Sequence, residues 1–317
     1  MKIIFCINLF LFSNIFLFSQ APFDNKGSGT KDDPYQIWTK KHLIELADSL
    51  PQNLADKRNW TMGKSFRLMA DINNVTRCIG GGYRFDCHFY GSGKKINIAM
   101  NNSGYSFASV GGFSSYKIAS IDSLTVDGYF VNEGYTGICS AIMYDSYVSY
   151  CINNTDVSYA GITYGNYGTI SYCLNNGSIT GFDCVGGIVS MQEYNVLHCI
   201  NTGKITATGN ADNYDGAGGI AGISAPNNTT HCINIGSVEG IDKIGGITGH
   251  TYGHPYGDSE LTNCSNYGFI KGVERVGGIA GINISKNTGT GTSITKCYNS
   301  GVVEGEKDTG GIVGKED

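Results

Sequence analysis

One motif recurs along the second half of the chain and limits what the chain can fold into. Each copy contains Cys-x-Asn, and from the second copy onward it continues with Asn-x-Gly, a β-branched residue and a closing Gly-Gly-Ile. The cysteines are Cys151, Cys173, Cys199, Cys232, Cys264 and Cys297. The asparagines are Asn153, Asn175, Asn201, Asn234, Asn266 and Asn299. Spacings of 22, 26, 33, 32 and 33 positions between these cysteines are typical of a solenoid, in which each copy forms one coil.

The pattern within a copy predicts strands rather than helices. No segment between the glycines has the periodicity that a helix of about 10–12 residues needs. Each copy instead contains three short strand-like pieces, around Cys-x-Asn, Gly-x-Ile/Val and Gly-Gly-Ile, with corners that tolerate left-handed backbone. We therefore expect an all-β, right-handed parallel β-helix whose coils stack at about 4.8 Å, the handedness following from strand twist.

Stacked coils place matching side chains above one another. The six asparagines are expected to link their amides from coil to coil in a buried column. For the six cysteines, small buried thiols compete with disulfides or a metal site; we favour thiols, because equivalent positions one coil apart rarely give good disulfide geometry. Four cysteines outside this column are better disulfide candidates: Cys78, Cys87, Cys139 and Cys184.

One position conflicts with simple alternation along a strand. A residue such as Val148 stands three places before each column cysteine, here Cys151. Strict alternation would place the two side chains on opposite faces. Either a bulge lies between them or both faces of the strand are covered, and the sequence does not decide between these alternatives.

The start of the chain predicts export. Residues 1–21 combine Lys2, an interrupted apolar run and small residues at the end, which is the pattern of a cleaved signal peptide. The run is short for a membrane anchor, which needs about 20 apolar residues, and no other stretch is apolar enough to cross a bilayer. Cys6 would leave with the signal peptide, so the mature protein would contain ten cysteines.

The next segments are expected to cap and begin the solenoid. Residues 22–62 predict a cap, with a strand at 35–38 and a helix at 40–50 that begins after Thr39 and ends at Pro51. A cap covers the strand edges that an open end exposes. Residues 63–165 read as degenerate first coils, with Gly137-Ile138 and Gly161-Ile162 as eroded closures, and residues 166–317 as regular coils. One face of the helix is apolar: Leu43, Leu46, Ala47 and Leu50.

Several of these segments resemble a known family. Residues 27–37, Leu43 to Ala47 and Leu68 to Ile72 resemble the start of GLUG-repeat surface proteins, and the Cys-x-Asn-x-Gly-x-Ile…Gly-Gly-Ile-x-Gly units resemble the GLUG repeat itself. Such proteins are common in gut and oral Bacteroidetes and occur beside streptococcal immunoglobulin A peptidases. The resemblance covers nearly all of the mature chain and implies a β-helical, adhesin-like extracellular region without agreed catalytic residues. The peptidase zinc motif His-Glu-x-x-His does not occur here.

Acidic residues near the Gly-Gly-Ile closures are the main candidates for catalysis. They are Asp183, Asp215, Asp242, Glu274 and Asp308. Polysaccharide lyases and hydrolases on β-helices need converging carboxylates or a base. Because the offsets of these acids vary, we interpret them as solvated corners or weak calcium ligands, and we expect no catalytic residue, metal site or other cofactor.

Two further groups of residues are candidates for binding. His198 and His231 each precede a column cysteine and are expected to stack about 5 Å apart on the outside, which is too few ligands for a metal site. An insertion between two coils contains His250, Tyr252, His254, Tyr256 and Asp258. These residues predict a site for a sugar or a protein partner, the alternative being an exposed turn that covers the coil beneath. Insertions at 210–214 and 286–292 would share its edge.

Together these features predict a binding module that is secreted or lies on the outer surface of a bacterial cell. It would present an extended face to extracellular glycan or host protein. A net charge of −5 without a basic stripe argues against nucleic acid. The alternatives are a polysaccharide lyase or hydrolase on the same fold and a passive structural spacer. No capping helix follows Ile312, so we expect an open final coil, available for end-to-end association.

Overall fold

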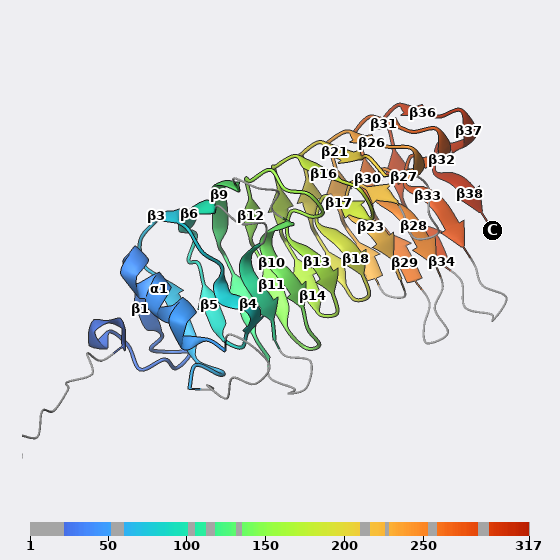
Figure 1. Ribbon diagram of the computed structural model, residues 1–317. Coiled ribbons are helices and arrows are strands. Elements are labelled where there is room, and N and C mark those ends of the chain that lie inside the picture. Colours follow the sequence, from blue (N-terminus) through green and yellow to red (C-terminus); the bar gives the residue numbers. More distant parts are fainter. Residues whose placement is uncertain are drawn as a thin grey trace, which may run out of the picture.

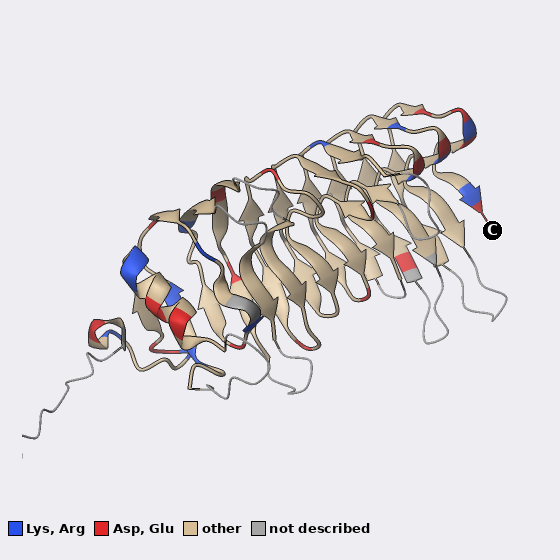
Figure 2. Cartoon of the chain, viewed as in Figure 1, with Lys and Arg blue, Asp and Glu red and all other residues tan. Residues whose placement is uncertain are grey.

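The chain forms a parallel β-solenoid, which confirms the fold expected from the repeat. The computed structural model describes residues 22–51, 60–100, 105–111, 118–130, 135–209, 216–225, 228–252, 259–284 and 292–316. Each strand pairs in parallel with the matching strand of the next coil, and the coils stack along one axis (Figure 1). Charged residues gather at the helical end and in the last coils, while the strands between them are nearly free of charge (Figure 2).

Three sheets surround the main core along the solenoid. The first sheet contains β1 (Tyr35–Ile37), β2 (Ser65–Leu68), β5 (His88–Tyr90), β8 (Ser120–Asp122), β11 (Tyr147–Ser149), β14 (Thr169–Ser171), β19 (Val196–Leu197), β24 (Asn228–Thr230), β29 (Ser259–Thr262) and β34 (Thr292–Thr295). The second contains β3 (Ile72–Val75), β6 (Lys95–Met100), β9 (Thr125–Phe130), β12 (Ile152–Asn153), β15 (Leu174–Asn175), β20 (Ile200–Asn201), β25 (Ile233–Asn234), β30 (Ser265–Asn266) and β35 (Tyr298–Asn299). The third contains β4 (Ile79–Phe85), β7 (Tyr105–Val110), β10 (Thr136–Ile142), β13 (Thr163–Asn166), β18 (Val189–Gln192), β23 (Ala221–Ser224), β28 (Thr248–Tyr252), β33 (Ala280–Ile284) and β38 (Val313–Glu316).

Two shorter sheets form a second lobe beside the later coils. The fourth sheet contains β16 (Ile179–Gly181), β21 (Ile205–Ala207), β26 (Val238–Glu239), β31 (Ile270–Lys271) and β36 (Val303–Glu304). The fifth contains β17 (Val185–Gly186), β22 (Ala217–Gly218), β27 (Asp242–Gly245), β32 (Glu274–Gly277) and β37 (Lys307–Gly310). The second core lies between them and contains Val157, Ile179, Val185, Ile205, Ala217, Val238, Ile244, Ile270 and Val276.

The expectation of three strands per copy was therefore too simple. In the described residues, the copy from Thr169 to Gln192 contains five short strands, β14 to β18. The segment before the cysteine forms a strand of its own in the first sheet. The closing piece is split as well, because Gly187 and Ile188 separate β17 in the second lobe from β18 in the main sheet.

A left-handed corner resolves the conflict with strand alternation. The residue before each column cysteine has a positive φ of 52° to 55°, which turns the chain sharply between two strands: Tyr150, Tyr172, His198, His231, Asn263 and Lys296. Val148 and Cys151, on either side of one such corner, are therefore both fully buried. The corner is a one-residue turn at a backbone conformation that is uncommon for residues other than glycine.

The asparagine column forms as the repeat predicts and separates the two cores. Asn201 Nδ2 donates to Asn234 Oδ1 of the next coil at 2.9 Å and to the carbonyl oxygen of Gly203 at 2.9 Å. Its own Oδ1 accepts a hydrogen bond of 2.8 Å from Asn175. Because every amide of the column links two coils and a corner, the buried side-chain amides are satisfied.

The second glycine of a Gly-Gly pair is needed where the asparagine of the next coil lies against it. A Cβ on Gly187 would lie 2.5 Å from Cγ of Asn201 and 2.2 Å from the carbonyl oxygen of Gly219. Val185, just before the pair, belongs to the second core, and Ile188, just after it, belongs to the main core. The glycines and the asparagine column thus form the partition between the two lobes.

All ten cysteines of the described chain are thiols. The expectation of disulfides among the four cysteines outside the column is therefore wrong. Cys87 precedes β5 and donates to the carbonyl oxygen of Thr61, whereas Cys139 lies within β10. In the column, Cys232 donates to the carbonyl oxygens of Val196 and Thr230. Burial raises the pKa of the Cys139 thiol, which keeps it protonated.

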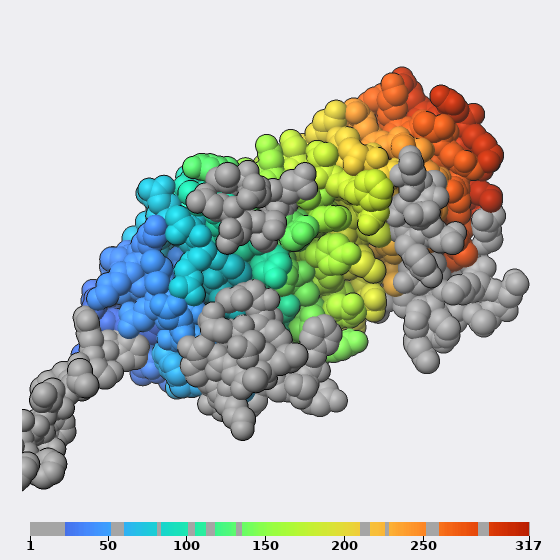
Figure 3. Space-filling view, in the orientation of Figure 1, coloured from blue at the N-terminus to red at the C-terminus, as the bar shows by residue number. Residues whose placement is uncertain are grey.

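The two ends of the solenoid differ. The described residues contain one α-helix, α1 (Lys40–Ser49), which begins after Thr39 as predicted, with the Thr39 hydroxyl accepting from the His42 amide at 3.3 Å. Together with the short turn η1 (Pro22–Asn25), it lies at the first coils. At the opposite end of the elongated molecule (Figure 3), Ile312 is 40% exposed, whereas its equivalent Ile279 is fully covered by the next coil. No helix in the described chain is long and apolar enough to cross a membrane.

The amide column should contribute measurably to stability. We expect Asn201→Ala to lower the free energy of unfolding by about 1–3 kcal/mol, because it leaves Asn175 and Asn234 each lacking a buried hydrogen-bond partner. Urea unfolding followed by circular dichroism measures the loss. The matched control is Asn176→Ala, in an exposed pair, which should change stability by less than about 0.5 kcal/mol. Equal losses in the two variants would contradict the role of the column.

Candidate functional site

The predicted binding insertion begins inside a strand. His250 and Tyr252 belong to β28, whereas His254, Tyr256 and Asp258 lie outside the described residues. His250 is 4% exposed and pairs in register with Ile223 and Ile282. The expectation that His250 is an exposed ligand-binding residue is therefore wrong, because β28 continues through this position and places it in a row of buried apolar side chains. Of Tyr252, only the backbone pairing with Ile284 is described.

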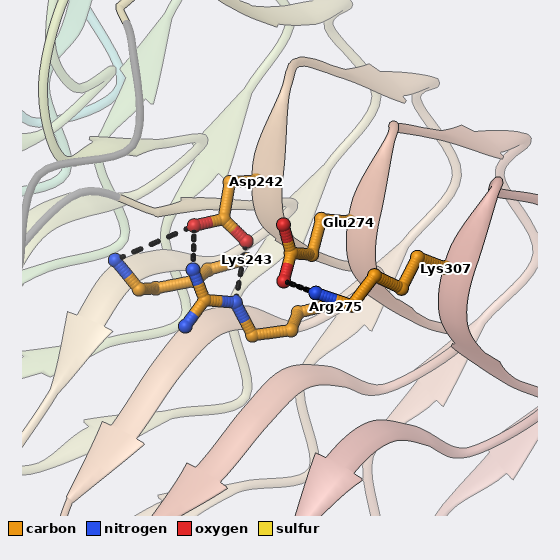
Figure 4. A network of polar contacts seen from close by, with 5 residues as sticks. All are labelled: Asp242, Lys243, Glu274, Arg275 and Lys307. Carbon is orange, nitrogen blue, oxygen red and sulfur yellow. Dashed lines mark hydrogen bonds and ion pairs between the residues drawn. The ribbon is translucent and has the colours of Figure 1, made fainter.

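A network of charged residues lies near His250, on strands β27, β32 and β37 (Figure 4). Asp242 accepts two hydrogen bonds from Arg275 of the next coil, one of them from Nε at 2.6 Å, and its Oδ2 lies 3.7 Å from Lys243 Nζ. The Asp242 and Lys243 side chains are almost fully buried. One coil further on, Glu274 accepts a hydrogen bond from Lys307, and this second ion pair is exposed.

The strand register explains why the acidic residues appeared irregularly spaced. Asp242 pairs with Glu274, and Glu274 pairs with Lys307, so the acidic row ends in a lysine. Asp308 lies one residue later, at a left-handed position equivalent to those of Lys243 and Arg275. The interpretation as solvated corners fits the exposed Asp183 and is wrong for Asp242, which is buried by its partner from the next coil; Asp215 lies outside the described residues.

Burial and neighbouring charges act together on His250. Burial, followed by the positive charges of Lys243 and Arg275, lowers the pKa of His250 to about 4, and Asp242 offsets part of this effect. His250 is therefore neutral at physiological pH and acts as an uncharged member of its row.

A column of stacked rings follows the left-handed corners on the outside of the solenoid. The ring centroids of Tyr150 and Tyr172 are 4.9 Å apart, and those of Tyr172 and His198 are 4.7 Å apart. The expected stacking of His198 on His231 is confirmed at 4.7 Å. Tyr150 and Tyr172 extend the stack of the two histidines. Taken one position at a time, these tyrosines look like ordinary surface residues in the sequence. In the described part of the chain, no group of three or more potential ligands gathers to hold a metal ion.

A pocket with a volume of about 290 Å³ opens on the third sheet, and its lining is almost entirely aromatic: Tyr105, Tyr135, Ser140, Tyr159 and Tyr164. Ser140 and Tyr164 lie on neighbouring strands, because Cys139 of β10 pairs with Thr163 of β13 and Ala141 with Gly165. Since Cys139 is buried in the main core, alternation directs the next side chain outward. The pocket therefore lies on the face of the third sheet that points away from the main core.

The pocket occurs where the second lobe begins. Isolated β-bridges join Thr136 to Ala160 and Ala160 to Gly186. The residues just before them, Tyr135, Tyr159 and Val185, therefore lie in one row. In later coils this row holds the aliphatic residues of the second core, but here it holds two tyrosines. We call the set Tyr105, Tyr135, Ser140, Tyr159 and Tyr164 the tyrosine pocket.

The rings of the tyrosine pocket meet at different angles. Tyr135 and Tyr159 have centroids 5.5 Å apart and are tilted by 38°, whereas Tyr159 and Tyr164 are 5.6 Å apart and nearly perpendicular at 85°. Burial raises the pKa of Tyr105 and of Tyr164, and Asp183 adds to the effect at Tyr164. The phenol groups therefore keep their protons at neutral pH and can donate hydrogen bonds.

The pocket was not predicted from the sequence, although the sequence contains a signal for it. Gly137-Ile138 and Gly161-Ile162 are eroded closures, and aligning the residues two places earlier puts Tyr135 and Tyr159 in one row, one coil apart.

The structure places the chain in the class of parallel β-solenoids, and its fold is similar to that of a solved protein structure. The chain matches a protein of Bacteroides ovatus named "putative immunoglobulin A1 protease" with a TM-score of 0.53, 17% sequence identity and coverage of 87% of each chain. At this identity the likeness shows a shared β-helical fold. No protein-family model and no curated protein sequence matches the chain.

The buried ion pair should matter more than an exposed one of similar chemistry. We expect Arg275→Met to lower the free energy of unfolding by about 3 kcal/mol, because it leaves the buried Asp242 carboxylate with Lys243 alone. The matched control is Lys271→Met, whose exposed pair with Glu304 spans 3.8 Å and should contribute less than about 1 kcal/mol. Urea unfolding at pH 7 compares the two variants, and similar losses would contradict a structural role for the network.

His250 predicts a specific loss of stability in acid. Its folded pKa of about 4 lies below the usual 6.5, so below pH 6.5 the unfolded chain binds a proton that the folded chain does not. The wild type should lose about 3 kcal/mol between pH 6.5 and pH 4 from this group. His250→Ile, which matches Ile223 and Ile282 in its row, should remove that component. Parallel pH profiles of unfolding free energy for the two proteins would contradict the assignment.

Proposed function

We propose that this protein is an adhesin-like extracellular binding module that presents an extended face of its solenoid to glycan or protein of a host. The observation that carries this proposal is the number of tyrosines with exposed rings in the described part of the chain. They are Tyr129, Tyr135, Tyr144, Tyr147, Tyr150, Tyr164, Tyr172, Tyr194, Tyr267 and Tyr298.

Exposed tyrosines suit recognition for a physical reason. A tyrosine offers a large, rigid contact area with a hydroxyl at its tip, and fixing its two side-chain torsions on binding costs little entropy. A rigid solenoid holds such side chains at fixed spacings, as the stacked column from Tyr150 to His231 illustrates. A ligand can therefore meet a prearranged surface, which lowers the ordering cost of binding.

The charge distribution favours an uncharged ligand over nucleic acid. The strands between the helical end and the last coils carry few charged residues (Figure 2). A nucleic-acid surface needs a continuous basic stripe to meet the phosphates. The charged network of β27, β32 and β37 pairs its acids with lysine or arginine, and we assign it to stability rather than to catalysis on polysaccharide.

The proposed location outside the cell rests on the amino-terminal sequence. Residues 1–21 have the pattern of a signal peptide, and the repeat resembles the GLUG repeat of surface proteins. We propose that the chain is a GLUG-type protein that is secreted or held on the outer surface of a bacterial cell. The similar fold of the Bacteroides ovatus protein is compatible with this proposal.

A direct binding screen tests the proposal. The mature protein should bind a subset of immobilised host-type glycans or purified secreted glycoproteins. The bound fraction should persist during washing at 0.5 M salt, because salt at this concentration, with a Debye length of about 4 Å, screens charge interactions but does not weaken aromatic contacts. Incubation with soluble polysaccharides, followed by chromatography of the products, serves as the control for enzymatic cleavage. Binding to no glycan and no glycoprotein would favour a structural spacer, and accumulation of shortened saccharides would favour the lyase or hydrolase alternative.

A further inference from the structure

We propose that the tyrosine pocket is a specific site of this protein and that it takes a single uncharged sugar ring, such as the terminal residue of a glycan. This inference rests on the proposed function and names the ligand class for one place on the binding face. Four features of the pocket support it: its position in the fold, its size, the arrangement of its rings and the uncharged side chains of its described lining.

The position of the pocket follows from a change in one row of the solenoid. From Val185 onward, the row contributes aliphatic side chains that pack into the second core and are covered by the fourth sheet. Tyr135 and Tyr159 occupy the same row but are larger and carry a polar tip. Tyr135 remains 43% exposed, whereas Val185 is fully buried. Along the chain, the side chains of this row therefore first line an open cavity and then pack into the second core.

The size of the cavity selects among ligands. A volume of about 290 Å³ lies at the lower limit of small-molecule sites, which span about 300–1,000 Å³. It corresponds to roughly ten water molecules at about 30 Å³ each. One pyranose ring fits such a space, whereas a folded protein would contact only its rim. The pocket therefore favours the end of a glycan over a protein surface.

The rings provide the two kinds of contact that a sugar needs. A pyranose has an apolar face of C–H groups and an edge of hydroxyl groups. The nearly perpendicular rings of Tyr159 and Tyr164 form a corner in which one ring can stack on the apolar face while the other borders the edge. The Ser140 hydroxyl forms a hydrogen bond of 3.1 Å with Ser109. The hydroxyls of Ser140 and of the protonated Tyr105 and Tyr164 can donate hydrogen bonds to the sugar hydroxyls or accept them.

The side chains of the described lining favour an uncharged ligand. The described lining residues are tyrosines and a serine, without lysine, arginine or histidine. The carboxylate of Asp183 is close enough to act on the ionisation of Tyr164. A sialic or uronic acid would bring a negative charge towards Asp183 and find no lysine or arginine among the described lining residues. An uncharged hexose avoids that cost.

The test compares methyl glycosides as defined probes. Methyl β-D-galactoside, methyl β-D-glucoside and methyl α-D-mannoside are presented to the mature protein, with methyl N-acetylneuraminide as the charged counterpart, and binding is followed by saturation-transfer NMR and calorimetry. We expect at least one neutral glycoside to bind and the charged one to bind at least tenfold more weakly. Equal affinity for neutral and charged glycosides would overturn the proposed ligand class.

Matched tyrosine variants locate the site. Tyr164→Ala and Tyr135→Ala should each weaken binding of the neutral glycoside about tenfold or more, the effect of losing about 1.4 kcal/mol of contact, and Tyr164→Phe should retain the stacking part. Trp38→Ala, which removes an aromatic ring of similar exposure (41%) at the helical end of the solenoid, should bind as the wild type does. Circular dichroism and thermal unfolding verify that each variant is folded.

The outcomes separate this inference from the proposed function. Unchanged affinity in the folded Tyr135 and Tyr164 variants, with binding by the wild type, would overturn the pocket and leave the binding function standing. Wild-type protein that binds glycans only as extended chains, and none of the methyl glycosides, would also overturn the pocket alone. Absence of binding to every glycan and glycoprotein would remove both.

Discussion

The hydrogen bond between asparagine amides of successive coils is the interaction on which the rest of this structure depends. Each buried amide donates to the next coil and to the corner of its own coil, so it joins coils and fixes a turn at once. An amide placed there needs room, and the second glycine of Gly-Gly-Ile supplies it. The repeat thus specifies a cross-section with two cores rather than one, because the backbone comes close to the amides between them.

The two-lobed cross-section also determines which part of the third sheet is open to solvent. Once the fifth sheet has begun, it covers the outward side of the third sheet, as the hydrogen bond from Ser190 Oγ to the carbonyl oxygen of Cys184 shows. Before that point the same side of β10 and β13 is open, and tyrosines border it. The tyrosine pocket and the second core are therefore alternative uses of the same row of positions.

Much of this architecture could be predicted from the sequence, because repeats report on stacking directly. The columns of Cys173 and Asn175 and the stack of His198 on His231 follow from the spacing of the repeat, and the helix follows from the cap at Thr39 and its apolar face. What escaped was local or depended on neighbouring coils. The left-handed corner at Tyr150 has no glycine to mark it, and the burial of Asp242 depends on Arg275, which lies 33 positions later in the chain. His250 appeared exposed because an irregular insertion follows it directly, although the strand ends only after that position.

The strand-for-strand match between coils has a consequence for how such a chain can change over time. The register at Asn201, Asn234 and Asn266 is the same, so the backbone leaving one of these positions is equivalent to the backbone leaving another. Removal or duplication of a whole copy between two of them would join ends that already fit, and each coil would still meet a suitable neighbour. Unequal recombination between the copies can therefore lengthen or shorten the molecule in steps of one coil while the helical cap and the tyrosine row near the start are left untouched. The length of the solenoid can then evolve independently of the surface near its start.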